Sequence, residues 1–537
     1  MNREASLEKL KSESLDLLII GGGITGAGIA LDAASRGLKT ALIEKKDFAY
    51  GTSSRSTKLI HGGLRYLKQL EFGLVKEVGS ERAVVHQLAP HLVIPEKMLL
   101  PLYEKRGLGS VLTSVGLKLY DWLAGVKPED QRKMLTRKQT LSREPLLNPQ
   151  DVKGGAIYAE YRTDDARLTI EIIKTASVHK ATIANYCEAT DFIYENGKVT
   201  GVKAIDHVSG GAFEIHAAMV VNAAGPWVDT LREKDKSKTG KKLHLTKGVH
   251  IVVPREKLPV TQAIYFDVGD GRMIFAIPRG RTTYIGTTDT NYAGLIDGVH
   301  TEKEDVEYLL RAVNQTFINS QLKSEDVESS WAGLRPLIHE EGKSASELSR
   351  KDEIFESPSG LISIAGGKLT GYRKMAERVV DLVVEKKFEE RKLLSCLTRS
   401  IKLTRASFKN VDEVRRYRNE TEKRLKVFQL GDYTDYLVST YGQQTEEIIS
   451  LIEKGSSDNE WRLTMAELDF CLENEMLVSA SDFLVRRTGM LYFDLPRAKR
   501  VFEPVMDELT RHFRWNESQR EDQGNEIQRL IQEASSY

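Results

Sequence analysis

A glycine run near the N-terminus carries the clearest chemistry in the sequence, which is the binding of a dinucleotide. Gly21, Gly23 and Gly26 stand at the spacing GxGxxG. In such a run the first glycine permits a tight turn, the second lets the backbone approach a pyrophosphate, and the third allows close packing of the following helix. Glu44 stands where an acid can accept hydrogen bonds from the two hydroxyls of an adenosine ribose. These residues predict a site for the pyrophosphate and ribose of a dinucleotide.

The elements around the glycine run have to hold these residues in place. Residues 16–20, DLLII, form a short apolar stretch typical of a buried parallel strand. Residues 27–36 are predicted to form a helix with small residues toward the sheet, and residues 39–44 a second strand that ends on Glu44. The helix N-terminus presents free N–H groups and a partial positive charge to the pyrophosphate. Together these elements are far more specific than the glycines alone.

The composition indicates an ordinary globular protein of several domains. The chain has 537 residues, of which 40% are hydrophobic and 29% charged, and its net charge is +1. This charge balance argues against nucleic acid as a partner. The cysteines form neither a disulfide framework nor a CxxC pair, and no cluster of His, Cys and Asp has the spacing of a metal site. Since neither a secretory signal nor a long apolar run is visible, we expect a cytoplasmic protein without a membrane-spanning helix.

Six further segments indicate which dinucleotide is bound. They are GTSSRSTK (51–58), LIHGGLRY (59–66), VVNAAGPWVD (220–229), YIGTTDT (284–290), AGLRPL (332–337) and LISIAGGKLT (361–370). In this order they resemble the FAD-dependent (aerobic) glycerol-3-phosphate dehydrogenase family, within the glycine-oxidase-like FAD superfamily. The stretch TSSRSTKLIHGGLRYL is long and chemically unusual, so it is the most specific part of the resemblance. The resemblance extends from about residue 16 to residue 378, and the tail matches only in being helical.

The resemblance implies a flavoprotein that binds FAD. The implied fold is α/β: a Rossmann-like FAD-binding domain of the glycine-oxidase or D-amino-acid-oxidase type, a mixed-sheet substrate domain and a C-terminal α-helical cap. The helix that begins near Thr370 would point its N-terminus at the pyrimidine edge of the flavin and stabilise negative charge there. The residues expected to bind FAD are Gly21, Gly23, Ile24, Thr25, Gly26, Glu44, Thr52, Ser53, Ser54, Lys58, His61, Gly62, Ala224, Gly225, Gly367, Lys368, Leu369 and Thr370.

The resemblance also implies a substrate that is a small phosphorylated alcohol. The implied reaction oxidises sn-glycerol 3-phosphate to dihydroxyacetone phosphate: the C2 hydride moves to flavin N5 and the electrons pass to a quinone of the respiratory chain. A guanidinium binds phosphate through two parallel hydrogen bonds, so arginine suits this substrate better than lysine. By resemblance Arg335, in a Gly-Leu-Arg-Pro turn, and Arg350 hold the phosphate, while Arg65, Tyr66 and Lys368 line the side of the alcohol.

Two histidines, His61 and His250, are candidates for removing the proton of the alcohol. The pKa of histidine suits a general base near neutral pH. In the alternative interpretation His61 holds the flavin loop or carries a covalent flavin link, and His250 is a hydrogen-bonded residue of a strand. The sequence favours neither histidine over the other, and Arg65 or Lys368 acting on a desolvated alcohol is a further alternative.

An FAD-binding domain of this type is discontinuous in the sequence. We assign it to residues 1–78, 155–235 and 350–395. Residues 79–154 and 236–349 would build the substrate domain, whose mixed sheet covers the flavin. Residues 396–537 would form the helical cap domain.

Rival functions are consistent with some of the same motifs. A glycerophosphate oxidase would pass its electrons to oxygen, but the extra internal insertion of such oxidases is not visible in this sequence. An amino-acid oxidase could use the same arginines to bind a carboxylate. A non-catalytic dinucleotide-binding regulator would have no use for Arg335, Arg350 and Lys368 beside a flavin.

A membrane surface and a second subunit are the remaining partners to consider. Residues 107–126, GLGSVLTSVGLKLYDWLAGV, are the most apolar stretch outside the predicted strands. They could lie at the inner face of the cell membrane, which would make the protein peripheral. We favour packing on the substrate domain, because the polar face of this stretch carries few cations. The sequence leaves the oligomeric state open, including a homodimer.

Overall fold

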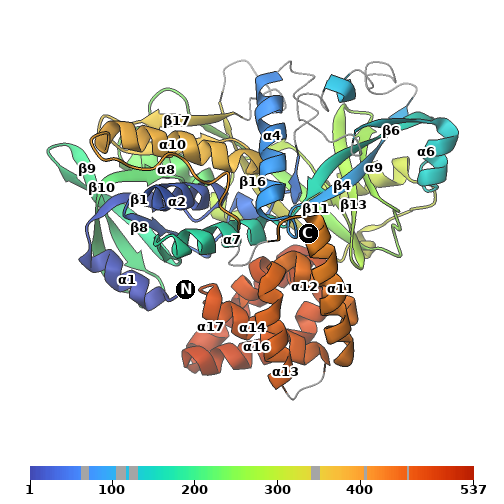
Figure 1. Cartoon of the computed structure of the whole chain (residues 1–537). Helices are drawn as coiled ribbons and strands as arrows, with labels where there is room; N and C mark the ends of the chain where they lie inside the picture. Colours follow the sequence, from blue (N-terminus) through green and yellow to red (C-terminus); the bar gives the residue numbers. More distant parts are fainter. Residues whose placement is uncertain (62–71, 104–115, 120–130, 340–350, 404–407, 456–458) are drawn as a thin grey trace.

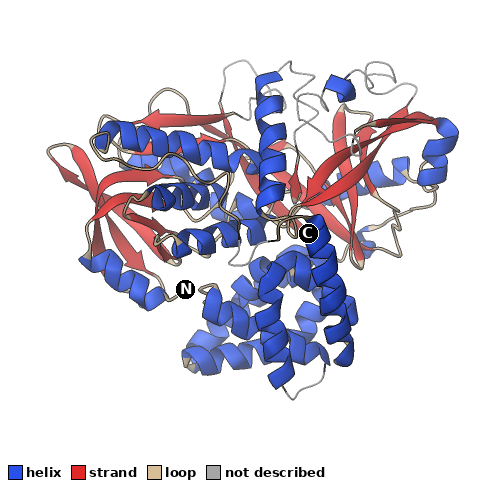
Figure 2. Cartoon of the chain, viewed as in Figure 1, coloured by secondary structure: helices blue, strands red, loops and turns tan. Residues whose placement is uncertain are grey.

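The computed structural model describes residues 1–61, 72–103, 116–119, 131–339, 351–403, 408–455 and 459–537. Two β-sheets lie side by side, and a bundle of C-terminal helices lies below them in the view of Figures 1 and 2. Four predicted site residues, Gly62, Arg65, Tyr66 and Arg350, lie outside the described residues, as does most of the apolar stretch 107–126. Within the described ranges, no helix combines the length and the hydropathy needed to cross a bilayer.

The first sheet places the predicted nucleotide-binding residues at one edge. Its strand order is β17-β18-β10-β1-β2-β7, with β8 and β9 joined to β10. β1 is parallel to both β2 and β10, and β10 is parallel to β18. Because parallel strands end at the same edge, Gly21 after β1, Glu44 after β2 and Ala224 after β10 come together there. The strands of this sheet are β1 (Leu15–Ile20), β2 (Thr40–Ile43), β7 (Thr182–Ala184), β8 (Cys187–Glu195), β9 (Lys198–Asp206), β10 (Ala212–Asn222), β17 (Asp352–Glu356) and β18 (Ile362–Gly366).

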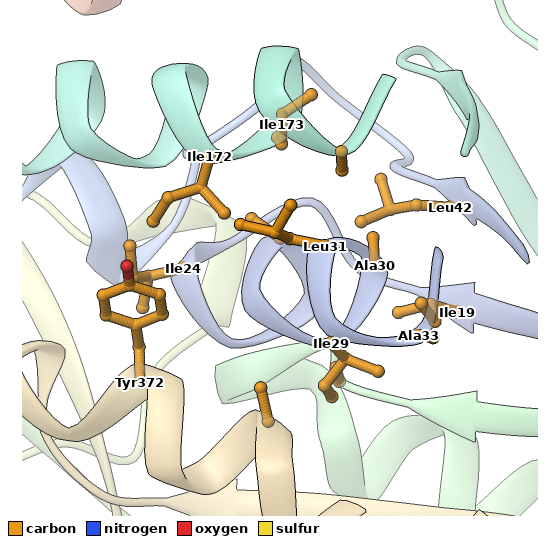
Figure 3. Packing of buried hydrophobic residues seen from close by; sticks show 14 of the residues in the cluster. Ile19, Ile24, Ile29, Ala30, Leu31, Ala33, Leu42, Ile172, Ile173 and Tyr372 are labelled. Carbon is orange, nitrogen blue, oxygen red and sulfur yellow. The ribbon is translucent and has the colours of Figure 1, made fainter. Parts of the chain in front are cut away.

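The helix after the glycine run packs between the sheet and two other helices. α2 (Ile24–Arg36) begins three residues before the predicted start, with Gly23 at its N-cap. It contacts α7 (Asp165–Val178) and α10 (Tyr372–Lys387), and its apolar side chains meet those of the strands and of both helices in Figure 3. A Cβ atom on Gly28 would lie 2.9 Å from Tyr372 Cδ2, so the small residues of α2 permit the close approach of α10.

The second sheet is mixed and carries two of the predicted site residues, His250 and Arg335. Its order is β15-β11-β14-β13-β12-β4-β6-β3, with β16 paired to β11 and β5 to β6. β12 is parallel to β4, whereas β11 is antiparallel to β14, β15 and β16. The strands are β3 (Leu59–Ile60), β4 (Ile94–Tyr103), β5 (Lys133–Thr136), β6 (Val152–Arg162), β11 (Leu243–Pro254), β12 (Ala263–Val268), β13 (Arg272–Arg279), β14 (Thr282–Gly286), β15 (Thr290–Asn291) and β16 (Ser329–Ile338).

The predicted turn around Arg335 is wrong, because this segment is part of β16. That strand pairs with β11 in an unbroken register from Leu243↔Ile338 to Val252↔Ser329. Pro336 is tolerated since β16, among the described strands, pairs only with β11, and an edge strand can accommodate a residue without an N–H group. The predicted domain boundary at residue 155 falls inside β6, and the division into three domains otherwise stays a prediction.

The C-terminal region is helical and has an apolar core of its own. Two of its helices, α15 and α17, contact strand β16 of the second sheet. A π-helical turn, Asp482–Arg487, lies between α14 and α15. Its helices are α11 (Val411–Val427), α12 (Thr434–Tyr441), α13 (Thr445–Lys454), α14 (Asn459–Asn474), α15 (Met490–Phe493), α16 (Leu495–Phe513) and α17 (Glu517–Ser535). The remaining helices are α1 (Arg3–Ser12), α4 (Phe72–Leu88), α6 (Arg137–Arg143), α8 (Val228–Lys234) and α9 (Lys303–Thr316).

Candidate active site

A cavity of about 1410 Å³ is lined by residues from both sheets. It collects most of the predicted site residues that the structure describes. Those on its wall are Gly21, Gly23, Ile24, Thr25, Glu44, Thr52, Ser53, His61, Ala224, Gly225, His250, Arg335, Gly367, Lys368, Leu369 and Thr370. Gly26, Ser54 and Lys58 are described but are not part of the wall.

The glycine turn has the geometry that a bound pyrophosphate requires. Gly21 has φ +116°, and a Cβ atom there would lie 2.5 Å from the carbonyl oxygen of Ala223. A Cβ atom on Gly26 would lie 1.9 Å from the carbonyl oxygen of Gly21, so Gly26 supports the turn from behind. Gly23 starts α2 without a side-chain cap, and the N-terminus of α2 therefore opens on the cavity with its partial positive charge. An anionic diphosphate fits this cradle.

Glu44 is bound to the glycine turn and keeps capacity for a ligand. Its Oε2 accepts a hydrogen bond from Gly22 N at 2.7 Å, and its Oε1 accepts one from Lys46 N at 2.9 Å. Burial raises the pKa of this carboxyl above its ordinary value. A carboxylate has about four acceptor positions, so two of them are left for the hydroxyls of a ribose. Glu44 thus fits the adenosine end of FAD.

The GGKLT segment forms a second glycine turn on the cavity wall. Gly366 and Gly367 have φ +79° and +78°. A Cβ atom would lie 2.6 Å from Lys351 O at the first position and 2.5 Å from Met375 Sδ at the second. The turn continues into the short 3-10 helix Leu369–Gly371, and α10 begins at Tyr372 rather than at the predicted residue 370. This wall carries Lys368.

Arg335 reaches the cavity from strand β16, and the GTTDT segment holds its guanidinium. Nη2 donates to Thr287 Oγ1 at 2.9 Å, and Nη1 donates to Asp289 Oδ1 at 3.1 Å. Both nitrogens lie 3.2 Å from the carbonyl oxygen of Thr288. The guanidinium lies over Gly248, where a Cβ atom would come within 2.2 Å of Nη2. The GTTDT segment thus holds the guanidinium on the cavity wall, with both terminal nitrogens engaged and its charge paired with Asp289.

His250 lies on the same face of the β11–β16 pair as Arg335. Every second residue of a strand points to the same face, so residues 246, 248 and 250 of β11 share one face with the β16 residues paired to them, and Arg335 is the partner of residue 246. Its side chain is buried and stacks on Trp331, with ring centroids 4.8 Å apart and planes 11° apart. Nε2 lies 3.0 Å from Thr57 Oγ1, whereas Nδ1 has no hydrogen-bond partner among the described residues. Burial, and then the charges of Arg335 and Lys58, hold the pKa of His250 well below its ordinary value of 6.5. The imidazole is therefore neutral at neutral pH.

His61 occupies a different position on the cavity wall. It is half-buried, and its ring faces Phe275 edge-on with the centroids 6.3 Å apart. The backbone carbonyl of His61 accepts a hydrogen bond from Thr370 Oγ1 at 3.3 Å, which joins this residue to the GGKLT turn. This placement suits a residue that supports the flavin wall.

Lys58 is directed away from the cavity. Its Nζ donates to Asp165 Oδ1 at 2.5 Å and to Ser54 O at 3.2 Å, and its side chain is buried. Asp165 belongs to α7, and the sequence of residues 51–58 gives no indication that Lys58 pairs with it. Sequence reasoning also missed Trp331 and Thr57, the two contacts of the His250 ring. Thr57 could have been found, because it belongs to the hydroxyl-rich segment already singled out.

Comparisons with known proteins agree with these features. A family model described as FAD dependent oxidoreductase matches residues 16–373, and one described as the C-terminal domain of alpha-glycerophosphate oxidase matches residues 396–520. The aerobic glycerol-3-phosphate dehydrogenase of Staphylococcus haemolyticus is 46% identical over 100% of this chain and 97% of its own length. That of Bacillus subtilis is 46% identical over 99% of this chain and 98% of its own.

Solved structures give the same result for the fold. The glycerol-3-phosphate dehydrogenase from Bacillus halodurans, solved in complex with FAD, is similar with a TM-score of 0.85 and 43% identity, covering 99% of this chain and 98% of that one. An L-alpha-glycerophosphate oxidase from Mycoplasma pneumoniae with FAD bound has a TM-score of 0.56 and 18% identity, covering 74% of this chain and 100% of that one. The second likeness concerns the fold alone.

Proposed function

The chain belongs to the FAD-dependent oxidoreductase family, alongside the aerobic glycerol-3-phosphate dehydrogenases, and we propose that it oxidises sn-glycerol 3-phosphate to dihydroxyacetone phosphate. The observation that carries the proposal is a single cavity in which two glycine turns face Arg335 and His250. FAD bound there supplies the two-electron acceptor for the hydride from C2. The first glycine turn, Glu44 and the GGKLT turn would hold it.

We propose that Arg335 binds the phosphate of the substrate. Thr287, Thr288 and Asp289 already fix its guanidinium, so little side-chain entropy is lost when the phosphate binds. Binding at the phosphate orients C2 and its hydroxyl for the reaction, which is a large part of the rate enhancement available to such an enzyme. Lys368, also on the cavity wall, would line the alcohol, and the roles proposed for Arg350, Arg65 and Tyr66 rest on the sequence resemblance.

His250 is our choice for the general base. Its neutral ring can accept a proton, and no described residue competes for Nδ1. We assign the ring proton to Nε2, which then donates to Thr57 Oγ1, because a buried Nδ1–H without an acceptor would cost about 1–3 kcal/mol. In this tautomer the Nδ1 lone pair would take the proton of the C2 hydroxyl, and because Nδ1 is buried in this structure, the wall around it has to open when the substrate binds. His61, held at the flavin wall, is assigned a supporting role.

The tautomer assignment makes Thr57 a positioning residue, and Thr57→Val tests this. Losing a hydrogen bond of about 1 kcal/mol should lower kcat roughly fivefold to tenfold, with little change in KM and in FAD content. Thr283→Val is the matched control, since it removes a buried hydrogen bond to Leu258 O in the same sheet but away from the cavity. Steady-state kinetics of the two variants decide the point. An unchanged kcat in Thr57→Val would exclude this role for Thr57.

Reduction of the flavin by the substrate is the direct test of the proposed function. Anaerobic mixing with sn-glycerol 3-phosphate should bleach the yellow flavin absorbance, because the cavity holds the phosphate and the alcohol beside the bound FAD. Glycerol, which lacks the phosphate, should bleach it far more slowly. If saturating glycerol 3-phosphate left the absorbance unchanged, the proposed substrate would be wrong.

For the electron acceptor we propose a quinone at the inner face of the membrane. The lining of the cavity includes the apolar side chains of Leu100, Leu102, Leu119, Met273 and Phe275. An apolar wall suits a quinone ring better than it suits a polar acceptor. The bleached enzyme should therefore regain its colour faster with a quinone analogue than in air. Stoichiometric peroxide formation in air, without reoxidation by the quinone analogue, would instead identify an oxidase.

A further inference from the structure

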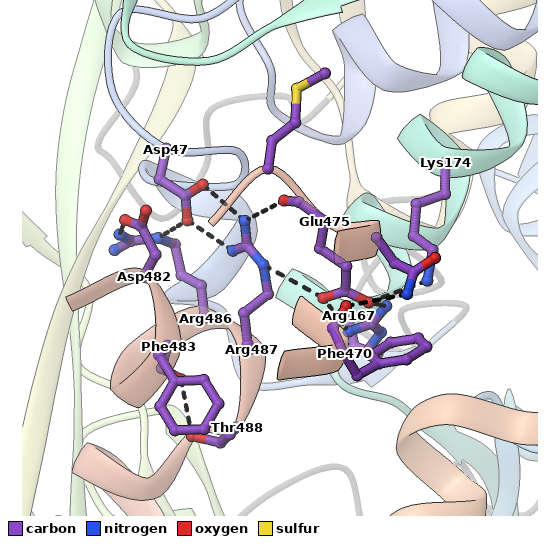
Figure 4. Close-up of polar contacts among 12 residues, drawn as sticks. Asp47, Arg167, Lys174, Phe470, Glu475, Asp482, Phe483, Arg486, Arg487 and Thr488 are labelled. Carbon is purple, nitrogen blue, oxygen red and sulfur yellow. Dashed lines mark hydrogen bonds and ion pairs between the residues drawn. The ribbon is translucent and has the colours of Figure 1, made fainter. Parts of the chain in front are cut away.

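The segment that follows β2 is tied to the C-terminal helical region by buried ion pairs. Asp47 has no exposed surface. Arg487 donates to it from Nη1 at 2.7 Å and from Nη2 at 2.9 Å, one bond to each carboxylate oxygen. Arg486 Nε donates to Asp47 Oδ2 at 2.5 Å, and Asn185 Nδ2 to Oδ1 at 3.3 Å. The contacts of Asp47 with the two arginines are drawn in Figure 4, and the positive charges hold the pKa of Asp47 below its ordinary value despite its burial.

Both arginines come from the π-helical turn Asp482–Arg487, which aims two consecutive side chains at one carboxylate. Such turns are rare and often occur at functional sites. Each arginine has a further partner: Arg486 Nη2 donates to Asp482 Oδ1 at 2.6 Å, and Arg487 Nη2 to Glu475 O at 2.9 Å. Since the charges of this group are paired, removing one member would leave an uncompensated buried charge, which is costly.

The segment anchored by Asp47 is the one that holds the glycine turn. Before Asp47, Glu44 accepts a hydrogen bond from Gly22 N at 2.7 Å. After it, Ala49 N donates to Gly22 O at 3.0 Å, and Ser53 Oγ accepts a hydrogen bond from Ile24 N at 2.9 Å. Residues 44–53 are thus joined to the turn and the start of α2 at three points, one before the anchor and two after it. Fixing Asp47 fixes the wall of the cavity that faces the adenosine and pyrophosphate.

We propose that Asp47, Arg486 and Arg487 make the C-terminal helical region a determinant of FAD retention, by holding residues 44–53 in the conformation that binds the nucleotide. None of the three lines the cavity, and in the described part of the chain no residue beyond Met375 does, so all three are positioning residues. The inference rests on FAD binding alone and is independent of the proposed substrate and acceptor.

The test is the rate at which the full-length holoenzyme releases FAD, followed by the fluorescence of the freed flavin. Arg487→Met keeps an unbranched apolar stem but removes both hydrogen bonds to Asp47, and should accelerate release at least tenfold. Arg487→Lys, which keeps the charge and loses the fork, should lie between this variant and the parent. At saturating FAD, the KM for glycerol 3-phosphate should stay within twofold in both variants.

Arg497→Met is the matched control, because it removes another buried arginine of the helical region whose partner Thr464 lies within that region. It should lower the melting temperature but leave FAD release at the rate of the parent. If Arg487→Met does not fold, Asp47→Asn carries the same expectation of faster release. Equal release rates in Arg487→Met and Arg497→Met, or an unchanged rate in Asp47→Asn, would overturn the inference. No substrate is present in the assay, so this outcome is distinct from failure of the proposed reaction.

Discussion

Replacing Arg335 by alanine should raise the KM for sn-glycerol 3-phosphate at least a hundredfold while FAD stays bound. Hydrogen bonds to charged groups contribute about 1.5–3 kcal/mol each, and a hundredfold loss of binding corresponds to about 2.7 kcal/mol. The variant also leaves Asp289 on the cavity wall without the guanidinium that pairs with it. Steady-state kinetics and the flavin absorbance per protein measure the two quantities.

Two further variants separate phosphate binding from a general loss of structure. Arg281→Ala removes an arginine of the same sheet whose exposed side chain pairs with Glu328, and its KM should equal that of the parent. Arg335→Lys keeps the charge without the planar fork and should give an intermediate KM. Glycerol has no phosphate, so the large preference for glycerol 3-phosphate over glycerol should shrink in Arg335→Ala. An unchanged KM in this variant would remove Arg335 from the phosphate site.

The FAD-binding fold could be predicted from the sequence because its signals are local. The apolar strand before Gly21, the helix after it and the acid after the second strand each depend on neighbouring residues, and the structure places their ends within three residues of the prediction. The roles of the glycines could also be predicted from the sequence, because Gly21 adopts a positive φ and because a Cβ atom at Gly26 would clash with the turn. The FAD cofactor and the fold class inferred from them are confirmed.

The parts of the site that depend on distant residues could not be predicted in this way. Thr57 and His250 are 193 residues apart, Lys58 and Asp165 are 107 apart, and Asp47 and Arg487 are 440 apart. Buried polar groups must be paired, but a sequence does not say by which partner. The proline after Arg335 likewise suggested a turn. Among the described strands β16 pairs only with β11, and this edge position, which lets a strand contain proline, is a tertiary property that the local sequence does not reveal.

Replacing His250 by asparagine should lower kcat by about a hundredfold to ten-thousandfold, the range expected when a general base is removed. Asparagine keeps a polar side chain beside Thr57 but cannot accept the proton of the alcohol. KM should change much less than kcat, since the phosphate contacts of Arg335 are unaffected. Single-turnover bleaching of the flavin absorbance by glycerol 3-phosphate should slow by the same factor, because the affected step is the oxidation itself.

The pH dependence distinguishes a base from a merely structural histidine. Burial lowers the pKa of His250, so its neutral form persists as the pH falls through 6.5, and kcat/KM should stay level there and decline only in more acidic solution. Below the lowered pKa the ring is protonated and cannot take a second proton, and this acidic decline should be absent in His250→Asn. His61→Asn is the paired variant: as a residue of the flavin wall it should change FAD content more than the pH profile. If His61→Asn abolished the acidic decline while His250→Asn kept both its kcat and that decline, His61 would be the base.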